Sequence, residues 1–369
     1  MSNFDVSDLA VKIACGASNE LLYDDKGMPS VMVKLPKMTW KDLGIGTSTD
    51  TFPAWIINGH EVDYIYFSKY MNIVQNSRAY SLPGQDYANN ITLDTSISRC
   101  TAKGEGWHLT TRLEWMAVAL WCLKNGTLPL GNNNYGKDHT ETVYKAIPKT
   151  KDAEGKTLHV AGGTGPLTWS HNRQQDGIWD LNGNGYEWVG GIRTVYGELQ
   201  VLSKDGATFG NDAADPDNSQ SSTSSLWYAI DGTTGALITP NGSGTTTNSL
   251  KIDKVGSKLT WVTGAISMGT PEQIYATLES VELDASVCDA AKHILQALGF
   301  YKPDDITAGA LGGDYVYFDN AQAERSFRCG GNYYDASRAG VFYANGSSSR
   351  STTNAVISLR SAYCDLPTA

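Results

Sequence analysis

The stretch RSFRCGGNYYDASRAGVFYANGSSSRSTTNAVISLRSAYCD, from Arg325 to Asp365, decides how the rest of the chain is interpreted. A few apolar, glycine and arginine positions are interleaved with Asn, Tyr, Ser, Thr, Asp and Ala. Tyrosine gives a large contact area at a low entropy cost, and small polar residues give adaptable hydrogen bonds. A catalytic site needs fixed titratable groups, and this stretch has few of them. The composition therefore favours a ligand-binding surface over an active site.

The stretch divides into a scaffold and a set of candidate ligand contacts. We expect Val341, Phe342, Ile357 and Leu359 in the core, and we expect Arg350 and Arg360 to brace the loops through backbone carbonyls, since a guanidinium donates several hydrogen bonds in a fixed fork. The other residues are predicted to form one continuous solvent-facing patch, with an ordinary polar loop as the alternative. The candidate ligand contacts are Asn332, Tyr333, Tyr334, Asp335, Ser337, Arg338, Tyr343, Asn345, Ser347, Ser348, Thr352, Thr353, Asn354 and Ala355.

Length and charge bound the classes of protein that remain. The 369 residues are 41% hydrophobic and 18% charged, which indicates a globular chain of one large domain with insertions or of two domains. The net charge of −10 argues against nucleic acid and anionic membranes as partners, since both attract basic patches. No apolar run reaches the length of a membrane span, so we expect no membrane insertion.

The N-terminus and the cysteines indicate the compartment of synthesis. MSNFDVSDLAVKIACG lacks a basic region followed by a long apolar run, so we expect synthesis in the cytoplasm without a signal peptide. The six cysteines form no CxxC pair, which argues against a zinc site and a dense disulfide framework. We therefore expect free, mostly buried thiols, with a Cys329–Cys364 disulfide as the alternative.

The N-terminal third alternates between strand and loop patterns. Residues 1–50 are predicted to be a separate N-terminal segment, with a strand over 31–36, a loop over 44–50 and a possible role as an assembly contact. A second strand is predicted around 61–70, with Val62, Tyr64 and Tyr66 on one face.

Two helices carry clear start and stop signals. Thr111 and Glu114 have capping-box spacing ahead of an apolar stripe that includes Leu113 and Leu120, and Gly126 stands at the stop position. A helical region is predicted to begin at 270–273, and 285–298 follows with Gly299 as its stop. Between these helices, residues 205–250 are rich in Gly, Ser, Thr, Asn and Asp, which predicts long surface loops or a small β insertion.

The segment WDLNGNG, which begins at Trp179, matches the first half of a calcium-binding loop. Asp180, Asn182 and Asn184 stand at ligand spacing, and Glu187 is the nearest additional carboxylate. Gly191 stands where the pattern requires a bidentate glutamate, so structural turn chemistry is the alternative that we favour. We expect no other cofactor. Trp179, Tyr186 and Trp188 are predicted to be core aromatics.

Three motifs in order make the chain resemble a known family. GWHLTTRLEWMAVALW from Gly106, WDLNGNGYEWVGG from Trp179 and RSFRCGG…SLRSAY from Arg325 are similar to the conserved motifs of the formylglycine-generating-enzyme branch of the C-type lectin fold. More closely, the chain resembles the variable proteins of diversity-generating retroelements, many of which are encoded by phages. The resemblance implies an α+β C-type lectin fold of the formylglycine-generating-enzyme-like subtype over 51–369, with a loop-rich insertion at about 201–320 and a variable ligand-binding region at about 332–358.

In that family, adenines of a C-terminal window are mutated, often at Asn codons of the type AAY. Such codons do not readily become Lys, Glu, Gln, Met or Trp, and residues 332–358 contain none of these five. The alternative is that a loop rich in Ser, Asn and Tyr lacks them by chance.

The resemblance implies a diversified ligand-binding protein, a phage receptor-binding or tail adhesin, and no enzymatic activity. Its expected partner is a variable protein or glycan on a bacterial surface, its expected location is the virion or else the bacterial surface, and a homo-oligomer would raise avidity. The alternatives are a non-diversified structural tail or lectin-like component, and an oxidase like the formylglycine-generating enzyme. That oxidase needs two closely spaced cysteines in the C-terminal motif, and here Cys329 and Cys364 stand far apart in sequence.

Overall fold

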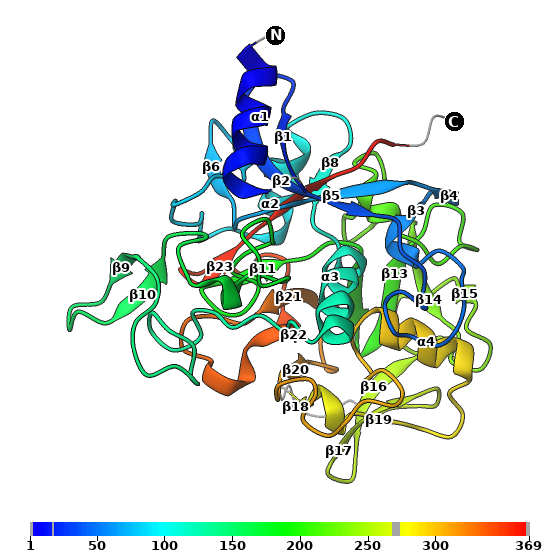
Figure 1. The fold of residues 1–369 in the computed structure, drawn as a ribbon. Helices are drawn as coiled ribbons and strands as arrows, with labels where there is room; N and C mark the ends of the chain where they lie inside the picture. The colour runs from blue at the N-terminus through cyan, green and yellow to red at the C-terminus, as the bar shows by residue number, and fades with distance from the viewer. Residues whose placement is uncertain (1–2, 17, 268–273, 367–369) are drawn as a thin grey trace.

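The computed structural model describes residues 3–16, 18–267 and 274–366, and it is a mixed α+β structure built mostly from sheets (Figure 1). The helical start predicted at 270–273 lies outside the described residues. Within the described ranges, no helix is long and apolar enough to cross a membrane. The helices are α1 (Asn3–Cys15), α2 (Leu93–Thr101), α3 (Arg112–Asn125) and α4 (Asp289–Ala297).

An antiparallel five-stranded sheet combines strands from the N-terminal part of the chain with the C-terminal strand β24. Its strand order is β1-β2-β5-β24-β8, so the C-terminal strand β24 lies between β5 and β8. The strands are β1 (Asn19–Tyr23), β2 (Pro29–Pro36), β5 (Tyr64–Ser68), β8 (Trp107–Leu109) and β24 (Ser361–Tyr363).

This sheet corrects the expectation of a separate N-terminal segment over 1–50. The predicted strand at 31–36 exists, but β2 pairs with β5 along five residue pairs, from Met32↔Ser68 to Pro36↔Tyr64. Val31 and Val33 are buried in the core, because the alternation that predicts the strand also gives it an apolar face. Residues 19–36 are therefore part of the same sheet as the C-terminus. A role of 1–50 in assembly stays a prediction.

A six-stranded sheet carries the C-terminal stretch. Its order is β18-β20-β22-β21-β11-β23, with parallel pairing for β20–β22 and β11–β23 and antiparallel pairing elsewhere. The strands are β11 (Tyr186–Trp188), β18 (Ile274–Thr277), β20 (Tyr315–Phe318), β21 (Ser326–Gly330), β22 (Gly340–Ser348) and β23 (Ile357–Ser358).

A third sheet has seven strands, and part of the predicted insertion at about 201–320 contributes to it. Residues 205–250 were expected to be surface loops or a small β insertion, and within that range the structure has long loops and two short paired strands of this sheet, at 227–230 and 237–238. The strands are β12 (Ile192–Val195), β13 (Glu198–Leu202), β14 (Trp227–Ile230), β15 (Leu237–Ile238), β16 (Lys251–Val255), β17 (Lys258–Val262) and β19 (Glu282–Leu283). Three small hairpins pair β3 (Ile56–Ile57) with β4 (His60–Glu61), β6 (Ile73–Gln75) with β7 (Arg78–Tyr80), and β9 (Pro148–Lys151) with β10 (Thr157–Val160).

Helix α3 lies at the centre of the molecule, between the three sheets (Figure 1). The predicted capping box is confirmed, since the Thr111 side chain accepts from the Glu114 amide and Glu114 bonds back to Thr111, and Gly126 ends the helix at φ 65°. The sequence predicted that only one apolar stripe of this helix would be buried. In the structure nearly the whole helix is buried, and even Arg112 and Glu114 are enclosed. One hydrophobic cluster joins α3, α4 and all three sheets, so the insertion shares the core of the C-terminal stretch.

The scaffold residues predicted in the C-terminal stretch are in the core. Val341, Phe342, Ile357 and Leu359 are all buried. The Trp115 indole of α3 donates to the Val341 carbonyl at 2.7 Å, which fixes β22 against the helix.

Replacing Phe342 with alanine should lower the free energy of unfolding by about 3–5 kcal/mol, because it removes a fully buried ring from the common core. Urea denaturation followed by tryptophan fluorescence measures this loss. Thr353→Ala is the matched control, since Thr353 lies in the same stretch and is exposed, and it should change the free energy by less than about 0.5 kcal/mol. A near-zero cost for Phe342→Ala would contradict the division into scaffold and ligand contacts.

Candidate ligand-binding surface

A glycine turn starts the first loop of the candidate surface. Gly330 and Gly331 end β21 with φ of 84° and 81°, a left-handed conformation that favours glycine. A Cβ at Gly331 would lie 2.5 Å from the Ala339 Cβ, so only glycine permits the chain to return to β22 so closely. Residues 332–338 form the loop between this turn and β22.

Loop 332–338 is held by its backbone. The Tyr333 carbonyl accepts from the Tyr135 amide at 2.8 Å, and the Ala336 amide donates to the Asn133 carbonyl at 2.9 Å. Neither bond involves a side chain of the loop. Tyr334, Ser337 and Arg338 are exposed and Tyr333 is half-buried, as expected for ligand contacts.

Aromatic rings from another part of the chain extend this loop. The Tyr333 ring lies 5.7 Å from the rings of both Tyr135 and His159 and meets Tyr334 edge-on at 5.1 Å. The Lys156 ammonium stands 4.8 Å from the Tyr135 ring centroid, at cation–π distance. Sequence reasoning missed these three residues, because they come from segment 131–160 and carry no local motif that links them to the C-terminal stretch.

Five of the candidate contacts are buried, which corrects the prediction of one continuous solvent-facing patch. Tyr343, Asn345 and Ser348 belong to β22, a strand enclosed between β20 and β21. In loop 332–338, Asn332 and Asp335 point inward: the Asn332 side chain accepts from the Tyr334 amide, and Asp335 accepts from the Asn332 amide at 3.0 Å. Burial raises the pKa of Asp335, although a hydrogen bond from Tyr186 opposes the rise.

The buried tyrosine of β22 belongs to a row of rings on one face of the six-stranded sheet. Tyr343 stacks on Tyr186 of β11 at 5.6 Å and meets Tyr317 of β20, also at 5.6 Å. Tyr275 of β18 continues the row 5.3 Å beyond Tyr317 and is 60% exposed. Tyr186 and Trp188 are buried as predicted, and the row places Tyr186 beneath the candidate surface.

Arg328 lies on the same face, above the Tyr186 ring. Its guanidinium is 4.6 Å from the Tyr186 ring centroid and 5.6 Å from that of Trp188. Within the described part of the chain, its Nε has no hydrogen-bond partner and it forms no ion pair. The guanidinium is a hydrogen-bond donor that is poorly solvated because it is buried, and this burial lowers the pKa of Arg328.

A second loop, residues 351–355, carries the remaining exposed candidates. Thr353, Asn354 and Ala355 are exposed, while Thr352 and, at the end of β22, Ser347 are half-buried. The loop is again fixed by its backbone, since the Asn90 amide donates to the Asn354 carbonyl at 2.9 Å. The exposed candidates therefore lie in two loops, separated along the chain by buried β22.

The two bracing arginines bind both carboxylates and backbone carbonyls. Arg350 pairs with Asp94 and Glu324 and donates to the Gln220 carbonyl at 2.9 Å. Arg360 donates to the carbonyls of Ser68 and Trp179. The predicted bracing role is confirmed for both, and the ion pairs are an addition to it.

The side chains of the four candidate calcium ligands already form hydrogen bonds or an ion pair within the protein. The Asp180 Oδ2 accepts from the Gly163 amide, and the Asn182 amide group bonds to Asn133 and to the Pro129 carbonyl. Asn184 bonds to Asn132 and to both backbone groups of Val160, while Glu187 pairs with Arg360 at 2.7 Å. Among the described residues, no group of three or more His, Cys, Asp or Glu is placed to hold a metal ion. These contacts are those of a structural turn.

Five cysteines have side chains that the structure describes, and all five are free thiols; burial raises the pKa of those in the core. Cys100, Cys122, Cys329 and Cys364 are buried and Cys288 is partly so. Burial raises the pKa of Cys329, whose sulfur accepts from Arg112 at 2.9 Å, and the pKa of Cys364 rises well above its usual value for the same reason. The expectation of free, mostly buried thiols is confirmed for these five.

Removing calcium should leave the melting temperature unchanged, because the oxygens of Asp180, Asn182, Asn184 and Glu187 already have partners, apart from the Asp180 Oδ1. Thermal unfolding in excess EDTA and in millimolar calcium measures this, with magnesium as the ionic-strength control. A filled calcium site would add about 2.7 kcal/mol of stability at a concentration 100 times its Kd. A calcium-specific rise in melting temperature would restore the calcium-loop interpretation.

Comparisons with known proteins return distant structural likenesses. No protein-family model and no curated protein matches the chain. Among solved structures, PvdO from Pseudomonas aeruginosa is similar over 93% of this chain and 97% of its own, with a TM-score of 0.37 and 11% identity. The U1 and P3c variants of a major tropism determinant are similar over 94% of this chain and 71% of theirs, with TM-scores of 0.28 and 0.29 and 10% identity each. At these values the likenesses carry no functional assignment, and the function proposed below is inferred from this chain's own residues.

Proposed function

We propose that this chain is a ligand-recognition protein of the retroelement-diversified type, with a C-type lectin fold, whose C-terminal loops bind varied protein or glycan targets on a bacterial surface. The observation that carries the proposal is how the loops are held. Backbone groups of Tyr333, Ala336 and Asn354 make the anchoring hydrogen bonds, to Tyr135, Asn133 and Asn90. Exposed side chains on these loops, such as those of Tyr334 and Ser337, can change without loss of these anchors, whereas the buried side chains of Asn332 and Asp335 accept loop amides themselves.

The surface combines variable and constant chemistry. Tyr334, Ser337, Arg338 and residues 353–355 are the exposed positions at which diversification changes the ligand. The rings of Tyr135, His159, Tyr186 and Tyr317 lie outside residues 332–358 and provide a rigid aromatic base. Rigid aromatic groups with adaptable polar neighbours are typical of binding sites that must accept many targets.

An adhesin on a virion, repeated in an oligomer, fits this design. A single site of exposed loops gains little binding free energy, and linking several copies raises the overall avidity by orders of magnitude. The location on a phage tail and the homo-oligomer are parts of the proposal.

The positions and pKa values of Cys329 and Cys364 argue against the oxidase alternative. Copper-binding thiolates of that reaction require two adjacent cysteines that ionise readily. Cys329 and Cys364 come from different sheets, in β21 and just after β24, and burial raises the pKa of both. A fixed structural or lectin-like component remains the second candidate, and it predicts a constant C-terminal stretch.

Changing both Tyr333 and Tyr334 to alanine should abolish or strongly weaken ligand binding and leave the fold intact, because Tyr334 is 45% exposed and the loop backbone is anchored independently. Retention of the wild-type protein on arrays of bacterial cells and glycans identifies the ligand used for the comparison. Tyr64→Ala is the matched control, since Tyr64 is an equally exposed tyrosine on the five-stranded sheet. A large fall in melting temperature for the double variant would show that the two rings are structural.

Deep sequencing of the 3′ end of the gene in a natural population tests diversification directly. Substitutions should concentrate at codons 333, 334, 337, 338 and 353–355, follow adenines of a nearby template copy, and spare codons 341, 342, 357 and 359, whose side chains are buried. Codons 112–125 of α3 give the background rate. If codons 332–358 are as constant as that helix, the fixed-component alternative replaces the proposal.

A further inference from the structure

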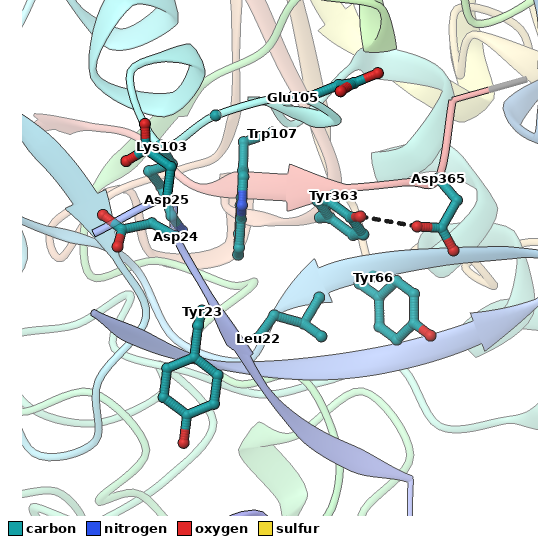
Figure 2. Close-up of a pocket in the computed structure, with 11 residues that line it drawn as sticks. Leu22, Tyr23, Asp24, Asp25, Tyr66, Lys103, Glu105, Trp107, Tyr363 and Asp365 are labelled. Carbon is teal, nitrogen blue, oxygen red and sulfur yellow. Dashed lines mark hydrogen bonds between the residues drawn. The ribbon is translucent and has the colours of Figure 1, made fainter. Parts of the chain in front are cut away.

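A pocket of about 460 Å³ opens on the outer face of the five-stranded sheet (Figure 2). It lies among β1, β5, β8 and β24 and the turn after α2. In Figure 1 these strands occupy the upper half of the molecule, whereas β20, β21 and β22 lie in the lower half. The pocket is therefore distinct from the candidate ligand-binding surface, and the inference drawn from it does not rest on the proposed function.

The floor of the pocket is aromatic and is built by strand register. Tyr363 of β24 pairs with Tyr66 of β5 on one side and with Trp107 of β8 on the other. Their ring centroids are 5.9 Å and 5.2 Å from that of Tyr363, so three rings from three adjacent strands form one surface. Leu22 of β1 completes the floor. Because the rings are fixed by the sheet, the floor is formed before any ligand arrives.

Carboxylates surround this floor. Figure 2 shows Asp25 on one side of the rings, Glu105 above them and Asp365 on the opposite side. Tyr363 donates its hydroxyl hydrogen to the Asp365 Oδ1 at 2.8 Å, which holds that carboxylate beside the ring. Glu105 and Asp365 are exposed, and within the described ranges neither forms an ion pair. Glu105 and Asp365 therefore present negative charge that no ion pair among the described residues neutralises, whereas Asp25 pairs with Arg78 and Lys26.

Arg78 and Lys103, the cations nearest Asp24, Asp25 and Trp107, already have partners among the residues that line the pocket. Arg78 pairs with Asp24 at 2.7 Å and with Asp25. Lys103 is buried with its Nζ 3.2 Å from the centroid of Trp107, and it donates to the hydroxyls of Ser30 and Ser361. Burial also lowers the pKa of Lys103 well below its usual value, which weakens its positive charge.

We propose that this pocket binds an organic ammonium group. An aromatic surface attracts a cation through the ring quadrupoles, and quaternary ammonium groups are recognised in this way by aromatic cages. Carboxylates at the rim add Coulomb attraction, and the volume lies within the range of small-molecule sites. An alkylammonium group has both properties that the pocket selects for, an apolar surface for the rings and a positive charge for Glu105 and Asp365. Its source is either a free small molecule or a lysine side chain of another protein.

Isothermal titration of the full chain with choline chloride, at low ionic strength, tests the proposal. The neutral isostere 3,3-dimethyl-1-butanol has the same shape without the charge and is the ligand control. Choline should bind saturably with one site per chain and quench tryptophan fluorescence, and the isostere should bind at least about tenfold more weakly. Equal binding of the two, or saturable binding of neither, would refute an ammonium site.

Two variants locate the binding. Glu105→Gln with Asp365→Asn removes both unpaired carboxylates and should weaken choline binding by about tenfold, whereas Asp289→Asn, an exposed carboxylate on α4, should leave it unchanged. Tyr363→Leu should weaken binding while the carboxylates remain, and circular dichroism checks that each variant is folded. If choline binds all variants as it binds the wild type, the site lies elsewhere and the proposal fails.

A third titration distinguishes the sources of the ammonium group. Nα-acetyl-lysine methylamide presents the same charge on a peptide-like backbone. Tighter binding of this probe than of choline identifies a lysine side chain of a partner protein as the ligand. Tighter binding of choline identifies a free quaternary ammonium compound. Loss of Tyr333 and Tyr334 should affect neither titration, which separates this site from the candidate ligand-binding surface.

Discussion

The buried ion pair between Arg360 and Glu187 is the constraint on which the arrangement of the two C-terminal loops depends. Arg360 donates to both Glu187 oxygens at 2.7–2.8 Å and to the carbonyls of Ser68 and Trp179, and both charged side chains are almost fully buried. Burying two charges is costly unless hydrogen bonds satisfy them, and here four do so. Since Glu187 belongs to β11 and Ser68 to β5, the pair joins the five-stranded sheet to the six-stranded sheet. Removing either partner would leave an uncompensated charge at the junction that positions the loops.

Local sequence signals correctly predicted those features of the fold that depend on neighbouring residues, such as the ends of a helix. The Thr111–Glu114 capping box and Gly126 predicted α3 closely, because helix ends are satisfied by neighbouring residues. The scaffold residues from Val341 to Leu359 were correctly placed in the core. The expected boundary at residue 50 failed for the opposite reason. The partner of β2 is β5, and that pairing depends on contacts between segments that no local pattern links.

The sequence predicted which kinds of residue form the candidate surface, but it predicted only part of their arrangement in space. Tyr343 and Asn345 were predicted to be ligand contacts because they follow the apolar pair Val341–Phe342 in a mostly polar stretch, yet their strand pairs with β20, from the predicted insertion, and both side chains are buried. Tyr135 and His159 were missed because their rings reach Tyr333 only through the folded path of segment 131–160. In both cases the deciding neighbour is remote in sequence, and neither periodicity nor motif spacing carries that information.

The same geometry limits where a diversified surface can vary. A substitution at Tyr343 would disturb stacking with Tyr186 and Tyr317 and the bond to Asn345, so it acts on the core as well as on any ligand. Substitutions at exposed loop positions such as Ser337 or Thr353 cost little, because surface changes away from caps and networks usually alter stability by less than about 0.5 kcal/mol. Variation at exposed positions such as Tyr334, Ser337 and Thr353 would therefore cost little in folding, whereas variation at buried Asp335 would remove the acceptor of the Asn332 amide. In the proposed function, loops 332–338 and 351–355 would select targets beside the rings of Tyr135 and His159 and the ammonium of Lys156, which lie outside residues 332–358.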